Sequence, residues 1–273
     1  MVKEKANRYN ELTGKEWLQY SFSIWRDIRK NNGEKQLKHP AMFPVQLAAR
    51  IINIFTKPND VVLDPFAGIG STIIAACKEG RKGIGFELSP EFTNVTQKRI
   101  QEVKASNLDK KNITPEIYNA DARKLLDYIK ANSANLCVTS PPYWDILNMR
   151  RTADIKVSTN YGDSKTDLGN IKKYDSFLNE LQDIFLKVYT ALKDNGHCVV
   201  ILMDIRKKDK FYPFHSDLAK KMEEIGFAFE DIIIWDRQHE YNNMRPLGYP
   251  YIFRINKVHE YILIFKKRAK KNG

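Results

Sequence analysis

The hexapeptide TSPPYW, residues 139–144, combines residue types that can recognise a planar base bearing an amino group. Two consecutive prolines, Pro141 and Pro142, remove two backbone donors and fix two φ angles, so the turn that they form is rigid. Such a turn exposes acceptors, the Ser140 hydroxyl and the carbonyls of Ser140 and Pro141, beside the ring of Tyr143. An exocyclic amine needs acceptors for its two hydrogens, and its ring needs a stacking surface. A plain surface turn that closes a strand is the alternative.

A second block, at residues 57–88, has the pattern of a cofactor site. It consists of a turn at 57–60, an apolar strand at 61–63, Asp64, a loop with Gly68 and Gly70, a helix at 72–77 and a strand at 83–86 that ends at Glu87. The glycines let a ligand approach backbone amides, and an acid after the second strand can bind both hydroxyls of a ribose. This β-loop-α-β unit therefore predicts a cofactor with an adenosine part.

Spacing distinguishes between the cofactors that contain adenosine. A dinucleotide fingerprint needs a third small residue where this chain has Ile73, and a phosphate-binding loop needs a lysine, which is absent here until Lys78. Asp64, an acid ahead of the glycines, disfavours pyrophosphate but can face the cationic amino end of a sulfonium cofactor. S-adenosylmethionine fits best. Asp121, after the third strand, can accept a hydrogen bond from the adenine amine, or it can cap a helix.

The elements that must position these residues follow a repeated β-α order. We expect a helix in 13–28, a packing helix that begins at Pro44, helices at 89–103, 124–130, 174–195 and 216–225, and strands that end near 121, at 134–138, at 197–204, at 229–235 and at 258–267. Gly196 is expected to end the helix before it. The order predicts an open α/β sheet, largely parallel, with a terminal antiparallel strand. Ligands of such sheets bind beyond the carboxyl ends of the strands, where Asp64, Glu87, Asp121 and Ser140 converge.

Composition bounds the class of protein. The chain has 273 residues, 42% of them hydrophobic, which is enough for one globular body, and a net charge of +12 favours a polyanionic partner. The three cysteines lie in apolar segments and the five histidines form no ligand pattern, so we expect no metal. The polar N-terminus and the lack of a long apolar run predict a soluble, cytoplasmic protein without a membrane segment.

Together, DPFAGIGST, Glu87, Asp121 and TSPPYW resemble the amino-methyltransferases that act on DNA, and SPPYW is most similar to their N4-cytosine branch. The resemblance runs from about His39 to Lys267, with the cofactor block ahead of the catalytic block. It implies a Rossmann-like class I methyltransferase fold with a mostly parallel seven-stranded sheet, and transfer of a methyl group from S-adenosylmethionine to the N4 amine of a cytosine flipped out of duplex DNA. The segment HPAMFPVQLAARII resembles the block that places Phe43 and Pro44 beside the methionine part of the cofactor.

The resemblance also assigns residues to roles. The catalytic residues are Ser140, Pro141, Pro142 and Tyr143, and the cofactor residues are Phe43, Asp64, Pro65, Phe66, Ala67, Gly68, Gly70, Ser71, Thr72, Glu87, Leu88, Asp121 and Ala122. We expect one methyltransferase domain over 1–273, with an N-terminal helical extension at 1–38 and target-recognition loops at 145–170 and 237–256. For contact with nucleic acid we expect Trp144, Arg237, Tyr241, Arg245, Tyr249 and Arg254. The partner is double-stranded DNA, a cognate restriction endonuclease is possible, and the sequence leaves monomer and homodimer open.

Three other functions compete with this one. An N6-adenine DNA methyltransferase usually has Asp or Asn where this chain has Ser140, so serine favours cytosine. Methylation of an RNA base on the same fold, and a catalytically idle nucleic-acid binder, also agree with the basic charge. Methylation at carbon 5 of cytosine needs a nucleophilic thiolate, typically after a proline, and no cysteine follows a proline here.

Overall fold

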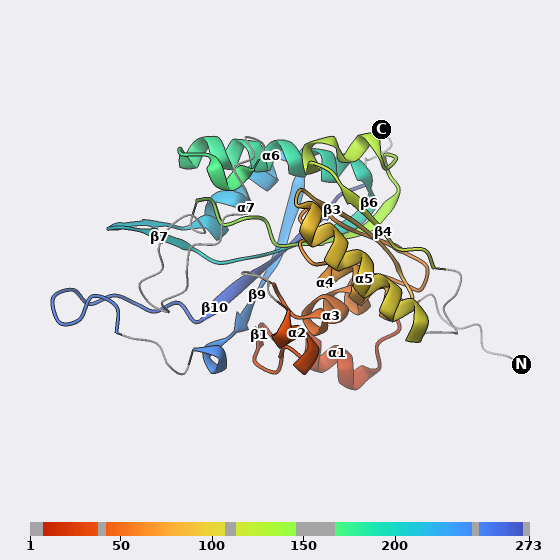
Figure 1. Ribbon diagram of the computed structural model, residues 1–273, viewed down its shortest axis with the longest axis horizontal. Coiled ribbons are helices and arrows are strands. Elements are labelled where there is room, and N and C mark those ends of the chain that lie inside the picture. Colours follow the sequence, from red (N-terminus) through yellow and green to blue (C-terminus); the bar gives the residue numbers. More distant parts are fainter. Residues whose placement is uncertain (1–7, 38–41, 107–112, 146–166, 242–245, 270–273) are drawn as a thin grey trace, which may run out of the picture.

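The computed structural model describes residues 8–37, 42–106, 113–145, 167–241 and 246–269 (Figure 1). Within these residues, the main sheet has eight strands in the order β1-β9-β10-β6-β5-β2-β3-β4. Their bounds are β1 Ile24–Trp25, β2 Val61–Asp64, β3 Lys82–Glu87, β4 Glu116–Asn119, β5 Ala134–Thr139, β6 Leu192–Leu202, β9 Phe227–Asp236 and β10 His259–Lys267. Only β10 runs antiparallel to its neighbours, β6 and β9, in this sheet of the described chain. The predicted fold class is confirmed, with one strand more than the seven expected.

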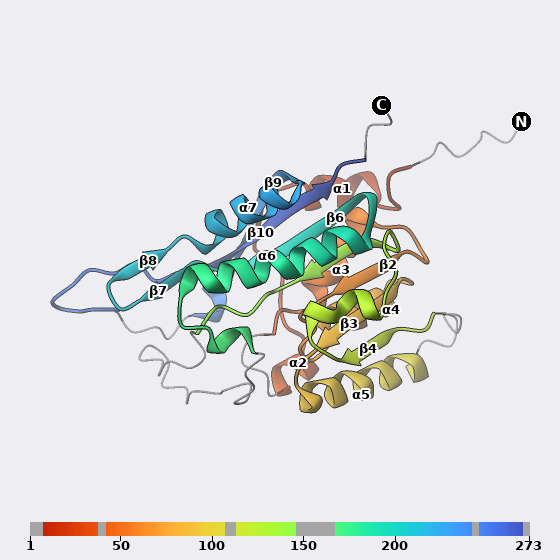
Figure 2. The same cartoon turned by 90° about the horizontal axis from the view of Figure 1, so that it is seen from above.

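A two-stranded hairpin in a basic stretch of the chain follows β6. It consists of β7 Ile205–Lys207 and β8 Lys210–Tyr212. Figure 2 shows this hairpin and the segment that precedes β10 extending together from the same end of the sheet. This end is the one where the parallel strands β5, β6 and β9 finish.

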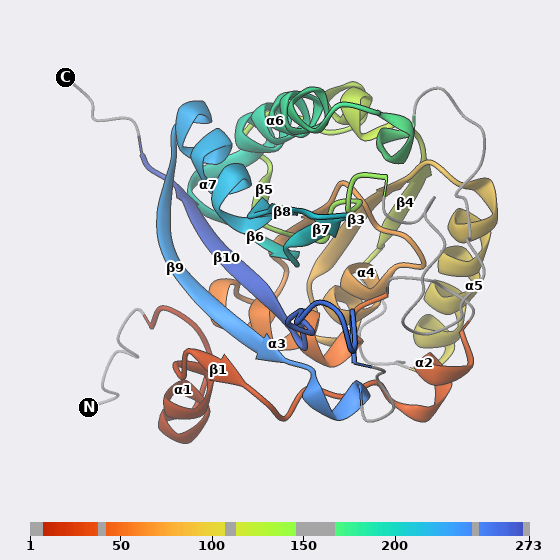
Figure 3. The ribbon, with the colours of Figure 1, turned by 90° about the vertical axis from the view of Figure 1, so that its left-hand side faces the viewer.

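Helices cover both faces of the sheet. They are α1 Gly14–Tyr20, α2 Asn32–Gln36, α3 Val45–Phe55, α4 Ser71–Lys78, α5 Pro90–Ser106, α6 Tyr174–Ala191 and α7 Phe214–Ile225, with short 3-10 helices η2 Ala122–Asp127, η4 Leu168–Asn170 and η5 Gln238–Glu240. Figure 3 shows α6 and α7 on one side of the sheet and α3 on the other. No helix in the described part of the chain is both long enough and apolar enough to cross a bilayer.

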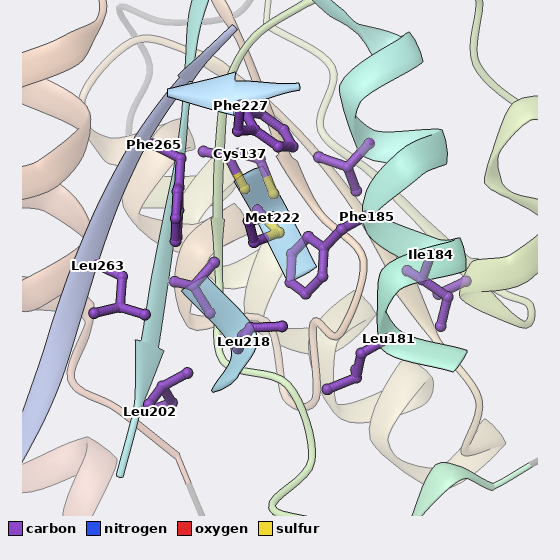
Figure 4. Close-up of a cluster of buried hydrophobic side chains, with 14 of the residues drawn as sticks. Cys137, Leu181, Ile184, Phe185, Leu202, Leu218, Met222, Phe227, Leu263 and Phe265 are labelled. Atoms are coloured by element: carbon purple, nitrogen blue, oxygen red, sulfur yellow. The ribbon is translucent and has the colours of Figure 1, made fainter. Parts of the chain in front are cut away.

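The core is divided by the sheet into two clusters. Because side chains alternate along a strand, Cys137 of β5 faces the cluster under α6 and α7, while Leu136 and Val138 face the cluster under α3 and α4. Figure 4 shows the first cluster, in which Phe185 of α6 and Met222 of α7 pack towards Cys137. All three cysteines are buried and unbridged.

Two glycines of β3 bring α4 unusually close to the sheet. A methyl group on Gly83 would lie 2.9 Å from the Cα of Ile73, and one on Gly85 would lie 2.4 Å from the Cδ1 of Ile73 and 2.9 Å from the Cβ of Ala67. Real side chains do not approach this closely, so glycine is required at both positions. The close helix-strand packing that a dinucleotide fingerprint obtains from a small residue at position 73 is obtained here from the strand instead.

Two local predictions were wrong. The helix expected in 13–28 ends at Tyr20, and Ile24–Trp25 form a strand that pairs with Ile234 and Trp235. Gly196 does not end α6, because β6 begins directly after Ala191 and contains this glycine. A methyl group on Gly196 would lie 3.0 Å from the Asn135 carbonyl oxygen, where the pairing of β5 with β6 shifts register, so the glycine allows a close backbone approach rather than a helix stop.

Candidate active site

The sheet reverses its order of strands between β2 and β5. From β2 the chain continues outward to β3 and β4, and then returns to place β5 on the other side of β2. Ligands of open α/β sheets bind at such a switch point, beyond the carboxyl ends of the strands. Asp64 ends β2 and Ser140 directly follows β5, so the two predicted blocks meet at this point although the cofactor block comes first in the chain.

Asp64 is the most deeply buried acid of the predicted site, with 1% of its surface exposed. Its Oδ1 accepts hydrogen bonds from the Thr139 hydroxyl, at 2.6 Å, and from the backbone amide of Phe66, at 3.0 Å. Its Oδ2 accepts none from any described residue. Burial raises the pKa of Asp64 to about 6, and the hydrogen bonds lower it only in part. Since buried polar atoms are normally paired, the free oxygen indicates a place for a donor from a ligand.

Thr139 connects the two blocks directly. Its hydroxyl donates to Asp64, and the next residue in the chain is Ser140. The acid of the cofactor loop therefore fixes the start of the catalytic turn. A second contact, from the Thr72 hydroxyl of α4 to the Val138 carbonyl at 3.3 Å, runs alongside it. Our sequence reasoning gave Thr139 no role; a hydroxyl at the buried end of a strand beside an acid-ended strand is the signal that could have found it.

The glycine loop after β2 is a tight turn with a second unpaired atom. The amide of Gly70 donates to the Ala67 carbonyl at 2.8 Å, and Gly70 has φ 82°, which favours glycine. The Ser71 hydroxyl, at the start of α4, is buried and has no hydrogen-bond partner among the described residues. Two unpaired polar atoms, Ser71 Oγ and Asp64 Oδ2, therefore border one loop. This donor and acceptor set fits a small ligand with a cationic amine, as the sequence predicts.

Glu87 lies where an acid can reach a ribose, at the carboxyl end of β3. One carboxylate oxygen accepts from the Gly68 amide at 2.8 Å and the other from the Ser89 amide at 2.7 Å. Burial raises the pKa of Glu87, and these two bonds oppose that rise. A carboxylate has about four lone-pair sites, so two stay available to a diol. Leu88 is exposed beside it, and its carbonyl accepts from the Asn119 amide group.

The remaining residues that we predict to bind the cofactor lie around this loop and differ in how far their side chains are exposed to solvent. Ala67 is buried against the sheet, Phe66 is half-buried 6.5 Å from Phe185, and Phe43 is buried in the cluster under α3. Pro65 and Thr72 are buried as well, Pro65 in the turn after Asp64. The role of each in cofactor binding stays a prediction.

Asp121 is engaged by its own neighbour. It precedes η2, accepts from the Arg123 amide at 2.9 Å, and holds the Arg123 guanidinium at 2.6 Å. Burial raises the pKa of Asp121, but these hydrogen bonds outweigh it and the pKa is lowered. Arg123 also pairs with Glu180 of α6. This geometry matches the capping alternative for Asp121, and contact of Asp121 and Ala122 with the cofactor stays a prediction.

The catalytic turn is held from the far side by β10. Pro141 is buried, while Ser140, Pro142 and Tyr143 are half-buried. The Tyr143 hydroxyl donates to the Glu260 carboxylate at 3.1 Å, and its ring meets Phe214 edge to face. Burial, followed by the charge of Glu260, raises the pKa of Tyr143 well above its usual value. Glu260 was missed by sequence reasoning, because nothing local marks it as a partner of a residue 117 positions away.

The contact between Tyr143 and Glu260 gives a test of what holds the turn. Tyr143→Phe is expected to lower the free energy of unfolding by about 1–2 kcal/mol, because a hydrogen bond to a charged acceptor is lost. We expect methyl transfer to stay within about tenfold of wild type, since the ring that stacks on a base is kept. Denaturant unfolding and initial-rate assays measure the two effects. An unfolding free energy equal to that of wild type would contradict the role of the hydroxyl.

Arg237, which we expected to contact nucleic acid, is paired within the protein, and its contact with nucleic acid stays a prediction. Its side chain forms ion pairs with Glu260 and, at 2.6 Å, with Glu240, and it lies over the rings of Trp235 and Tyr241. The segment 237–256, which we expected to be a target-recognition loop, thus begins with a half-buried, paired arginine. Arg237 orients Glu260, and through it Tyr143.

The side chain of Trp144 is also packed inside the protein rather than exposed to a nucleic acid. It is 4% exposed, its indole donates to the Ile171 carbonyl at 2.7 Å, and the rings of Tyr174 and Tyr212 lie within 5.3 Å of its ring. Lys207 covers another face at 4.1 Å. The prediction that Trp144 faces a base is therefore wrong in this conformation.

The other predicted nucleic-acid residues differ in access. Tyr249 is 77% exposed and Tyr241 is half-buried. Arg254 pairs with Asp209 of the β7–β8 hairpin at 2.7 Å. Arg245 lies outside the described residues, as does most of the 145–170 loop, of which only the two ends are described.

Comparison with known sequences covers both blocks. The profile of the N6/N4 DNA methylase family matches residues 2–98 and 134–272. The chain is 37% identical over 108 residues to the type II methyltransferase M.MthZI of Methanothermobacter thermautotrophicus, a match that covers 38% of this chain and 30% of that protein. It is 37% identical over 95 residues to the type II methyltransferase M.BglI of Bacillus subtilis, covering 34% of this chain and 26% of that one. These matches span less than a third of each relative.

Comparison with solved structures agrees on the fold. TrmN from Thermus thermophilus superposes with a TM-score of 0.50 at 15% identity, over 82% of this chain and 48% of that one. A SAM-dependent methyltransferase from Methanosarcina mazei gives 0.51 at 12% identity, over 81% and 98%. At such identities the likeness concerns the fold alone. The family match spans the acid-ended strand, the glycine loop and the SPPYW turn, and by it this chain is a member of the N6/N4 DNA methylase family of S-adenosylmethionine-dependent DNA amino-methyltransferases.

Proposed function

We propose that this protein transfers a methyl group from S-adenosylmethionine to the N4 amine of cytosine in double-stranded DNA. The observation that carries the proposal is the contact between Thr139 and Asp64, which places the Ser140 acceptor beside the cofactor loop. The family includes enzymes for N6 of adenine and for N4 of cytosine. A serine at position 140, where adenine enzymes usually have Asp or Asn, favours cytosine.

The residues of the loop have separate tasks in holding the cofactor. Asp64 Oδ2 would receive the ammonium of the methionine part, Glu87 would receive the ribose hydroxyls, and the amides after Gly68 would approach the ligand without side chains between them. When bound, S-adenosylmethionine supplies an electrophilic methyl group on a sulfonium centre. The negative charge of Asp64 complements this cation in a buried, weakly screened place.

The catalytic turn prepares the amine. The cytosine N4 nitrogen is a poor nucleophile because its lone pair is delocalised into the ring. Ser140 and the Pro141 carbonyl accept its two hydrogens and favour a pyramidal nitrogen whose lone pair faces the methyl group. The ring of Tyr143 would stack on the flipped base. On gaining the methyl group the nitrogen would lose one proton to solvent water, and the sulfonium would be left as a neutral thioether. Alignment of this kind can contribute about 7–11 kcal/mol to lowering a barrier.

The identity of the methylated base tests the proposal. Purified protein is incubated with labelled S-adenosylmethionine and mixed-sequence duplex DNA, and the DNA is then digested to nucleosides for mass spectrometry. We expect N4-methylcytosine. N6-methyladenine would keep the mechanism and refute the argument from Ser140, whereas label found only in RNA offered in parallel would refute DNA as the substrate.

We also propose the wider setting of the activity. The relatives named type II methyltransferases support a restriction endonuclease that cuts the same site when it is unmethylated. Residues 1–273 act as a single methyltransferase domain, with 1–38 as its extension, and the loops at 145–170 and 237–256 read the target. The same mass spectrometry, followed by sequencing of the methylated sites, would show whether the chain alone has a defined target.

A further inference from the structure

Two segments form a projecting arm, which we define as residues 205–212 and 246–258. The first is the β7–β8 hairpin, and the second is the segment before β10 (Figure 2). Arg254 joins them, because its guanidinium binds the Lys208 carbonyl at 3.0 Å and the Asp209 carboxylate at 2.7 Å. Lys257 adds a contact over the ring of Phe211 at 4.4 Å. The two segments thus act as one unit.

The tip of the arm exposes large apolar side chains. Tyr251 and Phe253 are each 91% exposed, and Ile255 is 69% exposed. Tyr251 is held on a defined turn, since the Gly248 carbonyl accepts from the amides of residues 251 and 252 at 2.9 and 2.8 Å, and Phe253 and Ile255 follow directly after this turn. Apolar groups gathered in this way on a soluble surface mark a site of interaction.

The rest of the arm is cationic. Its positive side chains are Arg206, Lys207, Lys208, Lys210, Arg254 and Lys257, and its one carboxylate, Asp209, is paired with Arg254. An apolar tip on a cationic stem complements a partner with an anionic exterior and an apolar interior. Duplex DNA, with its phosphates outside and its stacked bases inside, has this arrangement.

The arm leaves the sheet at the edge where the active site lies. The hairpin follows β6, the second segment lies between β9 and β10, and β6 and β9 run in the same direction as β5. Lys207 of the hairpin forms an ion pair with Asp145, five residues after Ser140. A duplex that delivers a base to Ser140 therefore also meets the arm.

We propose that the arm grips the duplex and that Tyr251 and Phe253 enter the base stack where the target base has left it. This inference rests on the proposed function. Extruding a base costs a few kcal/mol, because stacking and pairing are lost. Apolar side chains inserted at the gap restore part of the stacking and hold the flipped state. Neither side chain belongs to the cofactor loop or to the catalytic turn.

The test compares a matched duplex with one in which the target base is already mispaired. Both contain the site that wild type methylates in mixed-sequence DNA. The double variant Tyr251→Ala/Phe253→Ala is expected to act at least about tenfold more slowly on the matched duplex and within about threefold of wild type on the mispaired one, because a mispaired base costs less to extrude. The control is Leu186→Ala, which also removes an exposed apolar side chain but on α6, away from the arm, and should change neither rate.

Each other result overturns the inference in a distinct way. If the double variant lost the same factor in rate on both duplexes, the tip would be a general DNA-binding element. If its rates were unchanged, the tip would have no role on DNA. Unchanged rates together with a smaller sedimenting species for the variant would assign the tip to contact between two copies of the chain. Wild type that methylates no DNA would overturn the proposed function itself, and this is seen before any variant is made. Cofactor binding and thermal unfolding verify that the variant folds.

Discussion

Replacing Ser140 with alanine is expected to lower the rate of methyl transfer by about two to three orders of magnitude while the affinity for S-adenosylmethionine stays the same. The loss is of the size seen when one preorganised polar partner of a transition state is removed. Without the hydroxyl, one hydrogen of the amine has no acceptor in the turn, and the lone pair is no longer directed at the methyl group. Cofactor affinity is kept, because Asp64 is held by Thr139 and not by Ser140.

Single-turnover rates and equilibrium binding of the cofactor separate the two quantities for Ser140→Ala. Ser133→Ala is a matched control, since the Ser133 hydroxyl donates only a local bond to the Lys130 carbonyl. A Ser140→Ala protein that turns over at the wild-type rate would remove serine from the mechanism. A large loss of cofactor affinity would instead assign Ser140 to the cofactor site.

Asp64→Asn is expected to have opposite effects on folding and on binding. In the folded protein burial raises the pKa of Asp64 from 3.8 to about 6, so the folded state holds this proton more tightly than the unfolded state does. The ionised side chain therefore costs nothing below about pH 4, destabilises the fold increasingly as the pH rises through 6, and reaches a penalty of about 3 kcal/mol by pH 8. The neutral amide of asparagine avoids this penalty, but its NH2 group, in the place of Oδ2, is a donor without a partner. We expect a net stabilisation of the cofactor-free protein of about 1–3 kcal/mol at pH 8.

Binding should move the other way for the same variant. Loss of the charge that faces the cationic cofactor is expected to weaken its affinity by roughly ten- to a hundredfold. Denaturant unfolding at pH 5 and pH 8, with calorimetric titration of the cofactor, measures both effects. The gain in stability should be smaller at pH 5, where part of the wild-type carboxyl is already protonated. Asp127→Asn, at an exposed position, is the control, and a cofactor affinity unchanged in Asp64→Asn would refute the assignment.

The sequence was sufficient wherever a residue's environment is set by its own strand and turn. Asp64, Glu87 and Ser140 each follow a short buried strand, and the carboxyl ends of parallel strands converge by topology alone. The environments of Arg237 and Trp144 are set instead by pairings between distant segments. The ion pair between Arg237 and Glu260 forms only because β9 lies beside β10 in a register that sets Glu260 opposite Trp235, and no local pattern predicts that register.

Two elements were missed for a related reason. A strand of two residues, such as Ile24–Trp25, is too short for any periodicity, and it exists because β9 offers a free edge. Gly196 was interpreted by its most frequent local use as a helix stop, whereas the carbonyls of Lys193 and of Asn135 on the neighbouring strand leave no room for a side chain there. In both cases tertiary packing overrode a local signal.

The two glycines of β3 under α4 have a consequence for which substitutions this protein tolerates. A methyl group on Gly83 would meet the Cα of Ile73 in the helix that begins at Ser71, and one on Gly85 would meet the Cβ of Ala67 in the cofactor loop. Two positions on the next strand, β3, thus set the distance between the cofactor loop and the sheet. In a survey of random variants scored for cofactor affinity, we expect substitutions of these two glycines to be tolerated as poorly as substitutions in the loop itself. The cofactor site therefore depends on residues that lie behind it.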